Sequence, residues 1–263
     1  MKIVVIGGTG LIGSRLVTKL TEHGHNAIPA SPRLGINTIT GEGLASALDG
    51  ASVVVDVSNS PNFEYATALQ FFERTTHNLL AAEATANVGH HVALSVVGTK
   101  TLSQSSDPET TTAGYFRAKQ TQEELIAASG IPYSIVHATQ FFEFIKSIAD
   151  ASTVEGVVRV PPVAFQPMAA DDVASGVGRV AAGAPVNGIV EIGGPERFRF
   201  EEPVRSVLAA LNDPREVVTD SSAGYYRIPV GELTLVPGDG ARLGETRLDD
   251  WLRQTAGMKT AVA

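Results

Sequence analysis

The chain has 263 residues, of which 28 are acidic and 20 are lysine or arginine, so that its formal net charge is −8. It contains no cysteine, which excludes disulfides, thiolate catalysis and cysteine-bound metals. The excess of acidic residues argues against a main function in binding nucleic acid or an anionic membrane. No uncharged apolar run is long enough to span a bilayer, and no histidine pair has metal-binding spacing. We therefore expect a cytoplasmic protein with a small-molecule substrate and with no membrane, nucleic-acid or metal partner.

Short β-branched runs alternate with helical patterns through the first half of the chain, which is typical of a parallel sheet covered by helices. The long helix among these is predicted to begin at Ser60-Pro61, a capping residue followed by proline. After residue 140 the alternation fades. We predict an α/β fold in a single domain, residues 1–263, with a Rossmann-type doubly wound parallel sheet over 1–145 and a small C-terminal substrate-binding lobe over 146–263. The predicted strands are 2–6, 27–30, 53–58, 91–97 and 133–137, and the predicted helices are 11–23, 60–88 and 113–129.

Three regularly spaced glycines, Gly7, Gly10 and Gly13, follow the first predicted strand and lead into the first predicted helix. Glycine permits the tight turn and lets a pyrophosphate approach the backbone, and the helix N-terminus offers free N–H groups. In a chain with 26 glycines the spacing alone is weak evidence for a ligand, because the glycines could serve only to form a tight turn. The position between strand and helix favours the ligand. We predict a dinucleotide site formed by Gly7, Thr9, Gly10, Leu11, Ile12 and Gly13.

The residues near the end of the second strand of such a unit distinguish NAD from NADP. No acidic residue lies between Glu22 and Glu42, and the strand is followed by Ser31 and Arg33. A hydroxyl and a guanidinium suit the 2′-phosphate of NADP, although Arg33 could also be a solvated turn residue. We predict that NADP(H) is preferred over NAD(H). Residues 1–40 carry a local charge of +3, from Lys2, Arg15, Lys19 and Arg33 against Glu22.

Tyr115 and Lys119 lie four residues apart in the predicted helix 113–129, so that both point to one face. Ser95 lies near the carboxyl end of the strand 91–97, where open α/β sheets bind ligands. When a nicotinamide passes hydride to a carbonyl carbon, the oxygen must gain a proton. A tyrosine whose pKa is lowered by a nearby ammonium and by the oxidised nicotinamide can cycle that proton, and a serine hydroxyl can hold the substrate oxygen. We predict that Tyr115, Lys119 and Ser95 are catalytic, with Lys119 also bound to the nicotinamide ribose.

These features together resemble the atypical short-chain dehydrogenase/reductase superfamily, in its NmrA-like, NAD(P)H-binding branch. The resemblance implies that Val57 and Ser58 border the cofactor, and that the segment from His137 to Phe141, with Ala138 and Thr139, borders the nicotinamide. Many members of this branch lack the tyrosine, so that its presence here favours catalysis. The matching segments are GGTGLIG at 7–13, VVVDVSNSP at 53–61, ALSVVG at 93–98, YFRAKQTQEELI at 115–126 and IPYSIVHATQFFEF at 131–144.

An aromatic stretch follows the fifth predicted strand and is either the apolar wall of a substrate pocket or part of the core. We take Gln140, Phe141 and Phe144 from this stretch as candidate substrate residues. The adjacent carboxylates Asp171 and Asp172 are predicted to cap a helix rather than to act in catalysis.

The sequence favours an NADP(H)-dependent oxidoreductase that acts on a small, mostly apolar carbonyl, enone or quinone. The alternative is a non-catalytic, NADP(H)-binding redox sensor of the NmrA type. A nucleotide-sugar epimerase or dehydratase is less favoured, because such enzymes retain NAD and usually carry a longer C-terminal lobe.

Overall fold

The computed structural model describes residues 1–104 and 111–260, and the chain divides into two compact units. The first unit is Met1–His137 with Val173–Val190, and the second is Ala138–Asp172 with Glu191–Ala263. Within the described part of the chain, no helix has the length and apolar character needed to cross a membrane. The predicted division into a core of residues 1–145 and a lobe packed on it stays a prediction.

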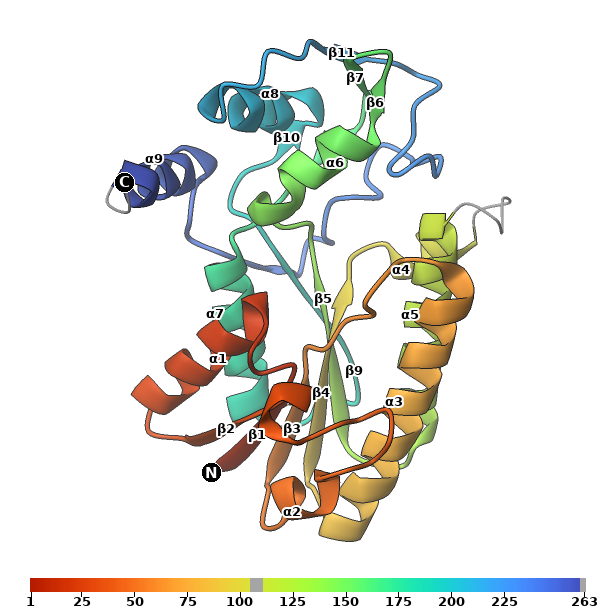
Figure 1. Cartoon of the computed structure of the whole chain (residues 1–263), viewed down its shortest axis with the longest axis vertical. Helices are drawn as coiled ribbons and strands as arrows, with labels where there is room; N and C mark the ends of the chain where they lie inside the picture. The colour runs from red at the N-terminus through yellow and green to blue at the C-terminus, as the bar shows by residue number, and fades with distance from the viewer. Residues whose placement is uncertain (105–110, 261–263) are drawn as a thin grey trace. The chain divides into compact units, whose positions relative to one another are not determined.

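The first unit is built on a parallel sheet, as predicted (Figure 1). Val4 of the first strand is paired with Ile28 on one side and with Val54 on the other, both in parallel register. The chain runs from β1 outward to β2 and then returns to β3 on the opposite side of β1. This reversal is the point at which open α/β sheets bind ligands. The strand order is β9-β5-β4-β3-β1-β2, formed by β1 (Lys2–Ile6), β2 (Asn26–Ala30), β3 (Val53–Asp56), β4 (His90–Val96), β5 (Tyr133–Ala138) and β9 (Gly188–Gly193).

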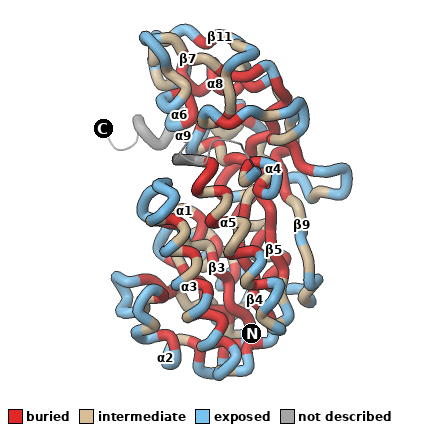
Figure 2. Tube along the Cα trace, turned by 90° about the vertical axis from the view of Figure 1, so that its right-hand side faces the viewer, coloured by how far each residue is buried: buried red, intermediate tan, exposed pale blue. Residues whose placement is uncertain are grey.

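The central strands are buried on both faces, which explains their unbroken runs of valine and isoleucine. Figure 2 shows β3, β4 and β5 largely in the colour of buried residues. Val4 and Val54 pack with Leu44 and Leu48 of α2 (Leu44–Leu48) in one apolar cluster. Each such side chain contributes roughly 1.5–3 kcal/mol when it is fully buried. This packing keeps the carboxyl ends of β1 and β3 adjacent.

Helices cover both faces of this sheet (Figure 1). On one face lie α1 (Leu11–Glu22) and the part of α7 (Ala170–Ala182) that belongs to the first unit, where Gly178 contacts Leu16. On the other face α3 (Tyr65–Ala86) packs against α5 (Thr111–Ala128), with Phe72 and Ala118 in one buried cluster. Two short helices, η1 (Pro32–Leu34) and α4 (Thr99–Ser103), follow β2 and β4.

The long helix begins at Tyr65, and the predicted start at Ser60-Pro61 is wrong. Two asparagine side chains bind the backbone of the preceding segment instead: Asn59 Oδ1 accepts the N–H of Ser60 at 3.0 Å, and Asn62 Oδ1 accepts the N–H of Glu64 at 3.1 Å. Asparagine competes in this way with helical hydrogen bonds. Residues 57–64 therefore form an irregular loop at the end of β3.

The second unit has its own core and small sheets. Phe165 stacks on Phe200 at 4.3 Å between ring centroids, and Tyr225 packs beside Phe200. Asp172 does not cap α7 as predicted: it lies in the first turn, and its Oδ2 accepts the N–H groups of Glu245 and Thr246. The elements of this unit are η2 (Phe142–Phe144), α6 (Ile145–Ala151), β6 (Thr153–Val154), β7 (Val157–Val160), β8 (Ala164–Phe165), β10 (Phe198–Arg199), α8 (Glu201–Ala210), β11 (Val217–Thr219), β12 (Arg242–Leu243) and α9 (Leu248–Thr260).

Candidate active site and cofactor-binding turn

The turn after β1 is closely packed at the first and third glycines of the predicted motif. Gly7 has φ +77°, and a Cβ there would lie 3.0 Å from the backbone of Ser58. A Cβ on Gly13 would lie 2.1 Å from the carbonyl oxygen of Gly7. Any side chain at Gly13 would therefore displace the turn, whereas at Gly10 the nearest atom is 3.3 Å away. These contacts match the physical requirements for which glycine is used in dinucleotide-binding turns.

The ends of three neighbouring strands meet at this turn. The N–H of Gly7 donates to the carbonyl of Ala30 at the end of β2, at 2.9 Å, and Gly7 also lies against Ser58 after β3. The hydroxyl oxygens of Ser31 and Ser58 are buried and have no hydrogen-bond partner among residues 1–104 and 111–260. The first turn of α1 contains no acidic residue. Unpaired hydroxyls beside free helix N–H groups fit a dinucleotide with its phosphates.

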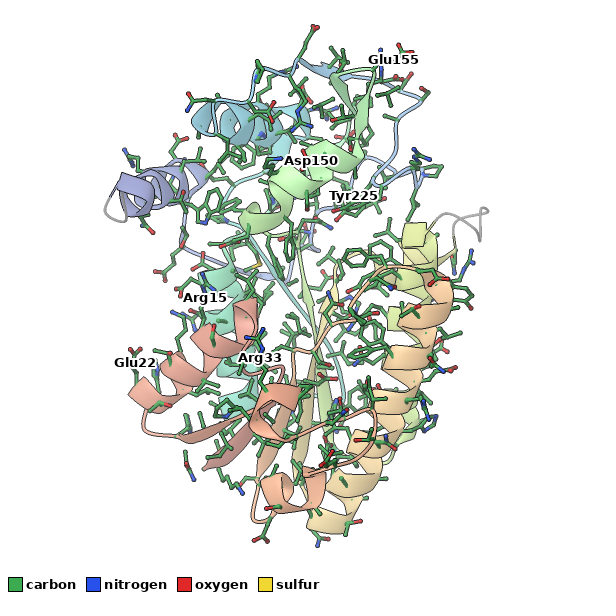
Figure 3. The ribbon with its side chains drawn as sticks, in the orientation of Figure 1. Arg15, Glu22, Arg33, Asp150, Glu155 and Tyr225 are labelled. Atoms are coloured by element: carbon green, nitrogen blue, oxygen red, sulfur yellow. The ribbon has the colours of Figure 1, made fainter. Side chains whose placement is uncertain are left out.

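Two arginines lie on elements next to this turn (Figure 3). Arg15 of α1 donates from Nη1 to the carbonyl of Leu11 at 2.7 Å. Arg33 lies on η1 and is exposed, and it makes no hydrogen bond or ion pair with any residue that the structure describes. Its guanidinium is therefore available to an anionic ligand, and the alternative of a solvated turn residue stays open.

Tyr115 projects from α5 into an aromatic cluster next to the 57–64 loop. Its ring makes edge-to-face contacts with Phe63 and Phe72, at 5.0 and 5.9 Å between centroids. Its hydroxyl donates to Asn59 Oδ1 at 3.1 Å. Burial raises the pKa of Tyr115. The phenol is therefore protonated at neutral pH, and the lower pKa expected beside the ammonium and an oxidised nicotinamide stays a prediction.

Lys119 is almost completely buried, at 2% exposure. Its ammonium donates to the carbonyl of Leu94 at 2.8 Å and to Gln122 Oε1, and it lies 4.7 Å from the ring centroid of Phe72. Tyr115 and Lys119 thus share Phe72 as a neighbour, consistent with the single face that their spacing predicts. The ammonium has three N–H groups, and these two hydrogen bonds leave one of them for a ligand.

Burial lowers the pKa of Lys119 to about 8, while the carboxylates of Asp56 and Glu123 act in the opposite direction. The full loss of solvation is the larger effect, because neither carboxylate hydrogen-bonds the ammonium directly. An ammonium with a pKa of about 8 is still mainly charged at neutral pH, so that the charge predicted for Lys119 is retained.

A buried carboxylate connects the loop after β3 to this lysine, and sequence reasoning did not identify it. Asp56 ends β3, and its Oδ1 accepts the N–H of Ser58 at 2.9 Å. Its Oδ2 accepts Gln122 Nε2 at 2.9 Å, and the other end of that amide accepts the Lys119 ammonium. The signal in the sequence was an acidic residue at the end of an otherwise apolar strand.

Ser95 is buried and bound to groups of its own chain. Its Oγ donates to Glu123 Oε1. That carboxylate oxygen also lies 3.0 Å from His137 Nε2. A second contact, of 3.5 Å, joins Ser95 Oγ to Thr99 Oγ1. A hydroxyl has one hydrogen, so that Ser95 would have to release Glu123 before it could donate to a substrate oxygen. The catalytic role of Ser95 stays a prediction that needs this exchange.

The residues predicted after β5 begin at the end of the first unit and continue in the second. Ala138 ends β5, and the N–H of Thr139 donates to the carbonyl of Ile192 at 3.1 Å. The aromatic stretch divides into two parts. Phe142 is buried against Trp251, whereas Phe141 and Phe144 stack at 5.4 Å, and Phe144 is 45% exposed.

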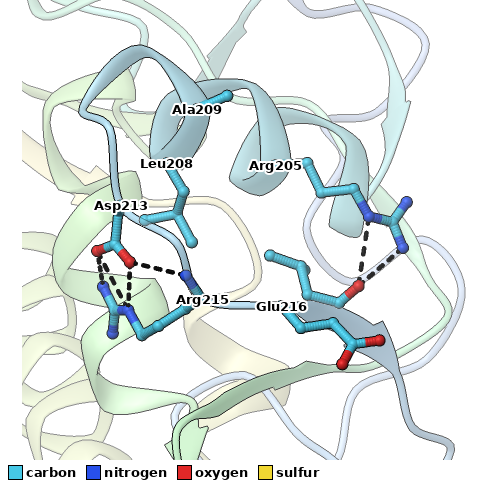
Figure 4. Close-up of a pocket in the computed structure, with 7 residues that line it drawn as sticks. Arg205, Leu208, Ala209, Asp213, Arg215 and Glu216 are labelled. Carbon is cyan, nitrogen blue, oxygen red and sulfur yellow. Dashed lines mark hydrogen bonds and ion pairs between the residues drawn. The ribbon is translucent and has the colours of Figure 1, made fainter.

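A pocket of about 460 Å³ lies elsewhere in the second unit, beside α8 and β11 (Figure 4). Arg205 donates to the carbonyl of Val217, and Arg215 forms a bidentate pair with Asp213. None of the predicted site residues lines it, and its arginines are already bound to the chain. The lining residues are Arg205, Leu208, Ala209, Asp213, Arg215, Glu216 and Val217.

A comparison with protein families shows the family to which the chain belongs. A family model described as NAD(P)H-binding matches residues 35–177, which is more than half of the chain. The protein therefore belongs to this NAD(P)H-binding family. A comparison with curated proteins finds no match.

Solved structures share the fold over nearly the whole chain. A short-chain dehydrogenase/reductase superfamily protein from Agrobacterium tumefaciens with bound NAD superposes with a TM-score of 0.72 at 16% identity, covering 99% of this chain and 98% of that one. The UDP-glucose 4-epimerase of Thermotoga maritima, with UDP-glucose, gives 0.70 at 15% identity, covering 100% of both chains. The GDP-mannoheptose C4 reductase of Campylobacter jejuni, with NADP bound, gives 0.68 at 14%, covering 98% of both.

These comparisons confirm the predicted family type: the chain is an NAD(P)H-binding protein with the fold of the short-chain dehydrogenases/reductases. At identities below 20% the structures show the fold alone. The narrower NmrA-like relationship stays a prediction.

Proposed function

We propose that the protein is an NADP(H)-dependent oxidoreductase that transfers hydride to or from a small, mostly apolar carbonyl, enone or quinone. The observation that carries this proposal is Tyr115, whose protonated phenol lies beside the 57–64 loop in a chain of the NAD(P)H-binding family. A chain that only bound the cofactor would not need a proton donor there.

The cofactor, when bound, supplies or accepts the hydride. Ser31 and Arg33 would hold the 2′-phosphate, because no carboxylate occupies the end of β2. Val57, Ser58, Ala138 and Thr139 would border the remainder of the molecule. The glycine turn would hold the pyrophosphate through Gly7, Thr9, Gly10, Leu11, Ile12 and Gly13.

Tyr115 would donate its proton to the substrate oxygen as that oxygen gains charge, and would recover it in the reverse reaction. Lys119 would use its third N–H to hold the nicotinamide ribose, and its charge would stabilise the phenolate left on Tyr115. The proposed substrate residues are Gln140, Phe141 and Phe144.

Cofactor choice is tested by thermal melting with NADPH and with NADH. At a concentration of 100 times Kd, a ligand stabilises the folded state by about 2.7 kcal/mol, which corresponds to several degrees in Tm. We expect NADPH to raise Tm more than NADH does. In the Arg33→Ala variant we expect NADPH to raise Tm only as much as NADH does. Arg253→Ala is the control, because Arg253 is exposed and its one ion pair within the described residues is with Asp250 of its own helix. An equal or larger shift with NADH would contradict the assignment of Arg33.

Catalysis is tested by NADPH oxidation against a panel of ketones, enones and quinones. Tyr115→Phe is expected to lower the rate by about 10²–10⁴-fold, the usual contribution of a positioned acid, with an unchanged NADPH melting shift. Full activity of this variant would remove Tyr115 as the proton donor. A wild-type chain that binds NADPH but oxidises it with no member of the panel would favour the redox-sensor alternative.

A further inference from the structure

The side chain of Gln140 is a buried amide without a partner. It is 5% exposed, and neither its Oε1 nor its Nε2 has a hydrogen-bond partner within the described chain. The hydroxyl of Thr139, at 1% exposure, is also unpaired. Three polar atoms on two consecutive residues are therefore removed from water with nothing to replace it.

The backbone of the same segment is held by hydrogen bonds to other residues of its unit. The N–H of Thr139 donates to Ile192, the carbonyl of Gln140 accepts the N–H of Met168 at 2.8 Å, and Phe142 donates back to Met168. A rigid backbone cannot turn to satisfy the amide. An apolar side chain of similar size would avoid the loss of solvation, because an unmade buried hydrogen bond is costly.

Gln166 of the same unit shows the ordinary state of a buried amide. It is also 5% exposed, but its Nε2 donates to the carbonyl of Gly194 at 2.8 Å, and its Oε1 accepts Arg197 Nε at 3.4 Å. The two glutamines share residue type and burial and differ in hydrogen bonding. The difference indicates that the partner of Gln140 is not among the residues that the structure describes.

We propose that the Gln140 amide is a ligand-binding group that pairs its N–H and C=O with a donor and an acceptor lying side by side on the ligand. This chemistry belongs to a carboxamide or to an α-hydroxy ketone, and Thr139 adds one further hydrogen bond. The inference rests on the proposed function, which provides two sources: the carboxamide of the nicotinamide, or a polar group next to the substrate carbonyl. In the second case the substrate is an apolar molecule with one hydrogen-bonding end.

The test compares Gln140→Met with Gln166→Met, without ligand, by thermal melting. Methionine has a similar volume and no need for hydrogen bonds. Gln140→Met is expected to raise Tm by a few degrees, because it removes an unpaired buried amide, whereas Gln166→Met is expected to lower it. A fall in Tm for Gln140→Met would overturn the proposal, because it would show that the amide is already satisfied in the folded chain.

Binding then identifies the source of the ligand group. If the partner is the nicotinamide carboxamide, Gln140→Met raises the Kd of NADP⁺ about tenfold, as for the loss of ~1.4 kcal/mol, and leaves 2′-phospho-ADP-ribose unaffected. If the partner is the substrate, NADP⁺ binding is unchanged, and KM rises for α-hydroxy ketones but not for the matching simple ketones. No change in either measurement would overturn the proposal.

The proposed function and this inference fail in different ways. A wild-type chain that binds neither NADPH nor NADP⁺ would contradict the proposed function. The comparison of the two glutamine variants needs no cofactor and would still decide whether Gln140 is unpaired.

Discussion

Lys119 and Gln140 both bury a polar group, but their hydrogen bonding differs. Around Lys119, in the first unit, Asp56 and Gln122 complete a chain of hydrogen bonds that ends on the backbone of Ser58. Around Gln140, in the second unit, the amide has no partner within residues 1–104 and 111–260. A satisfied network can be complete before any ligand binds, whereas an unpaired amide is incomplete without one.

The comparison predicts opposite responses to substitution. Removal of one member of a paired network leaves its partners buried and unsatisfied, which destabilises the fold. Removal of an unpaired buried group stabilises the folded state, as proposed for Gln140. The stabilities of variants at other residues of the two units test this contrast.

The largest effect is expected from Lys119→Met. The substitution removes the only ammonium that hydrogen-bonds Gln122 within the described chain, and it leaves Asp56 and Glu123 without that nearby cation. We expect a loss of about 2–5 kcal/mol in the free energy of unfolding, measured with urea, because the Leu94 carbonyl and Gln122 Oε1 each lose their donor at about 1–3 kcal/mol. Lys146→Met is the control, because its pair with Asp150 is half exposed and should contribute at most about 1 kcal/mol. Equal losses for the two variants would contradict the importance of the buried network.

The pH dependence of stability tests the same lysine. Burial lowers its pKa from 10.5 in the unfolded chain to about 8 in the folded protein. Between these values the unfolded chain binds more protons, so that the contribution of Lys119 to stability rises with pH, by at most about 1.4 kcal/mol per pH unit. Below pH 8 both states are protonated, and the contribution is constant.

This effect is isolated as the stability of the wild type minus that of Lys119→Met. The difference should increase from pH 8 to pH 10 and should be flat from pH 6 to pH 7. A flat difference across the whole range would mean that the ammonium is better solvated than its burial indicates.

A smaller loss in the free energy of unfolding is expected from Ser95→Ala than from Lys119→Met. The substitution removes the hydroxyl that donates to the Glu123 carboxylate, and hydrogen bonds to charged groups contribute about 1.5–3 kcal/mol. Ser206→Ala is the control, because its hydroxyl donates to the carbonyl of Glu202 in its own helix at an exposed position. If Ser95 is catalytic as predicted, NADPH oxidation will fall by more than the fraction of protein that unfolds.

The smallest effect is expected at a strained turn of the second unit. Tyr225 and Ile228 exchange backbone hydrogen bonds, and the two residues between them, Tyr226 and Arg227, have φ of +49° and +70°. Such turns favour asparagine and glycine. Arg227→Gly should stabilise the protein by about 1 kcal/mol, as judged by urea unfolding.

Arg227→Ala is the matched control for the turn, because it removes the charged side chain without relieving the positive φ. We expect no gain in stability from it. A gain of the same size from both variants would show that the arginine side chain, and not the backbone, is unfavourable there.

Sequence reasoning was most accurate where one local requirement dominates. The apolar runs at 2–6 and 53–58 predicted buried parallel strands, because a strand covered on both faces leaves no polar positions. Gly7 and Gly13 are required by contacts within their own turn, and the family match supports the ligand that their spacing predicted. The preference for NADP(H) remains to be measured.

Predictions were less accurate where distant residues compete for the same group. Ser60-Pro61 has the local signature of a helix start, but Asn59 and Asn62 bind the backbone there. Tyr115 and Lys119 share one face of their helix, but Lys119 directs its hydrogen bonds to Leu94 and Gln122, and burial raises the pKa of Tyr115. Spacing along a helix predicts a shared face but not the hydrogen-bond partners on it.

The class of fold, the glycine turn and the face shared by Tyr115 and Lys119 follow from the sequence alone, because strand burial, glycine conformation and helix periodicity are properties of short segments. Which buried polar groups have a hydrogen-bond partner depends on the tertiary structure. Asp56, Ser95 and Gln140 each look like an isolated polar residue in an apolar segment. Whether such a residue is paired depends on atoms far away in the chain, and that distinction separates the Lys119 network from the unpaired Gln140.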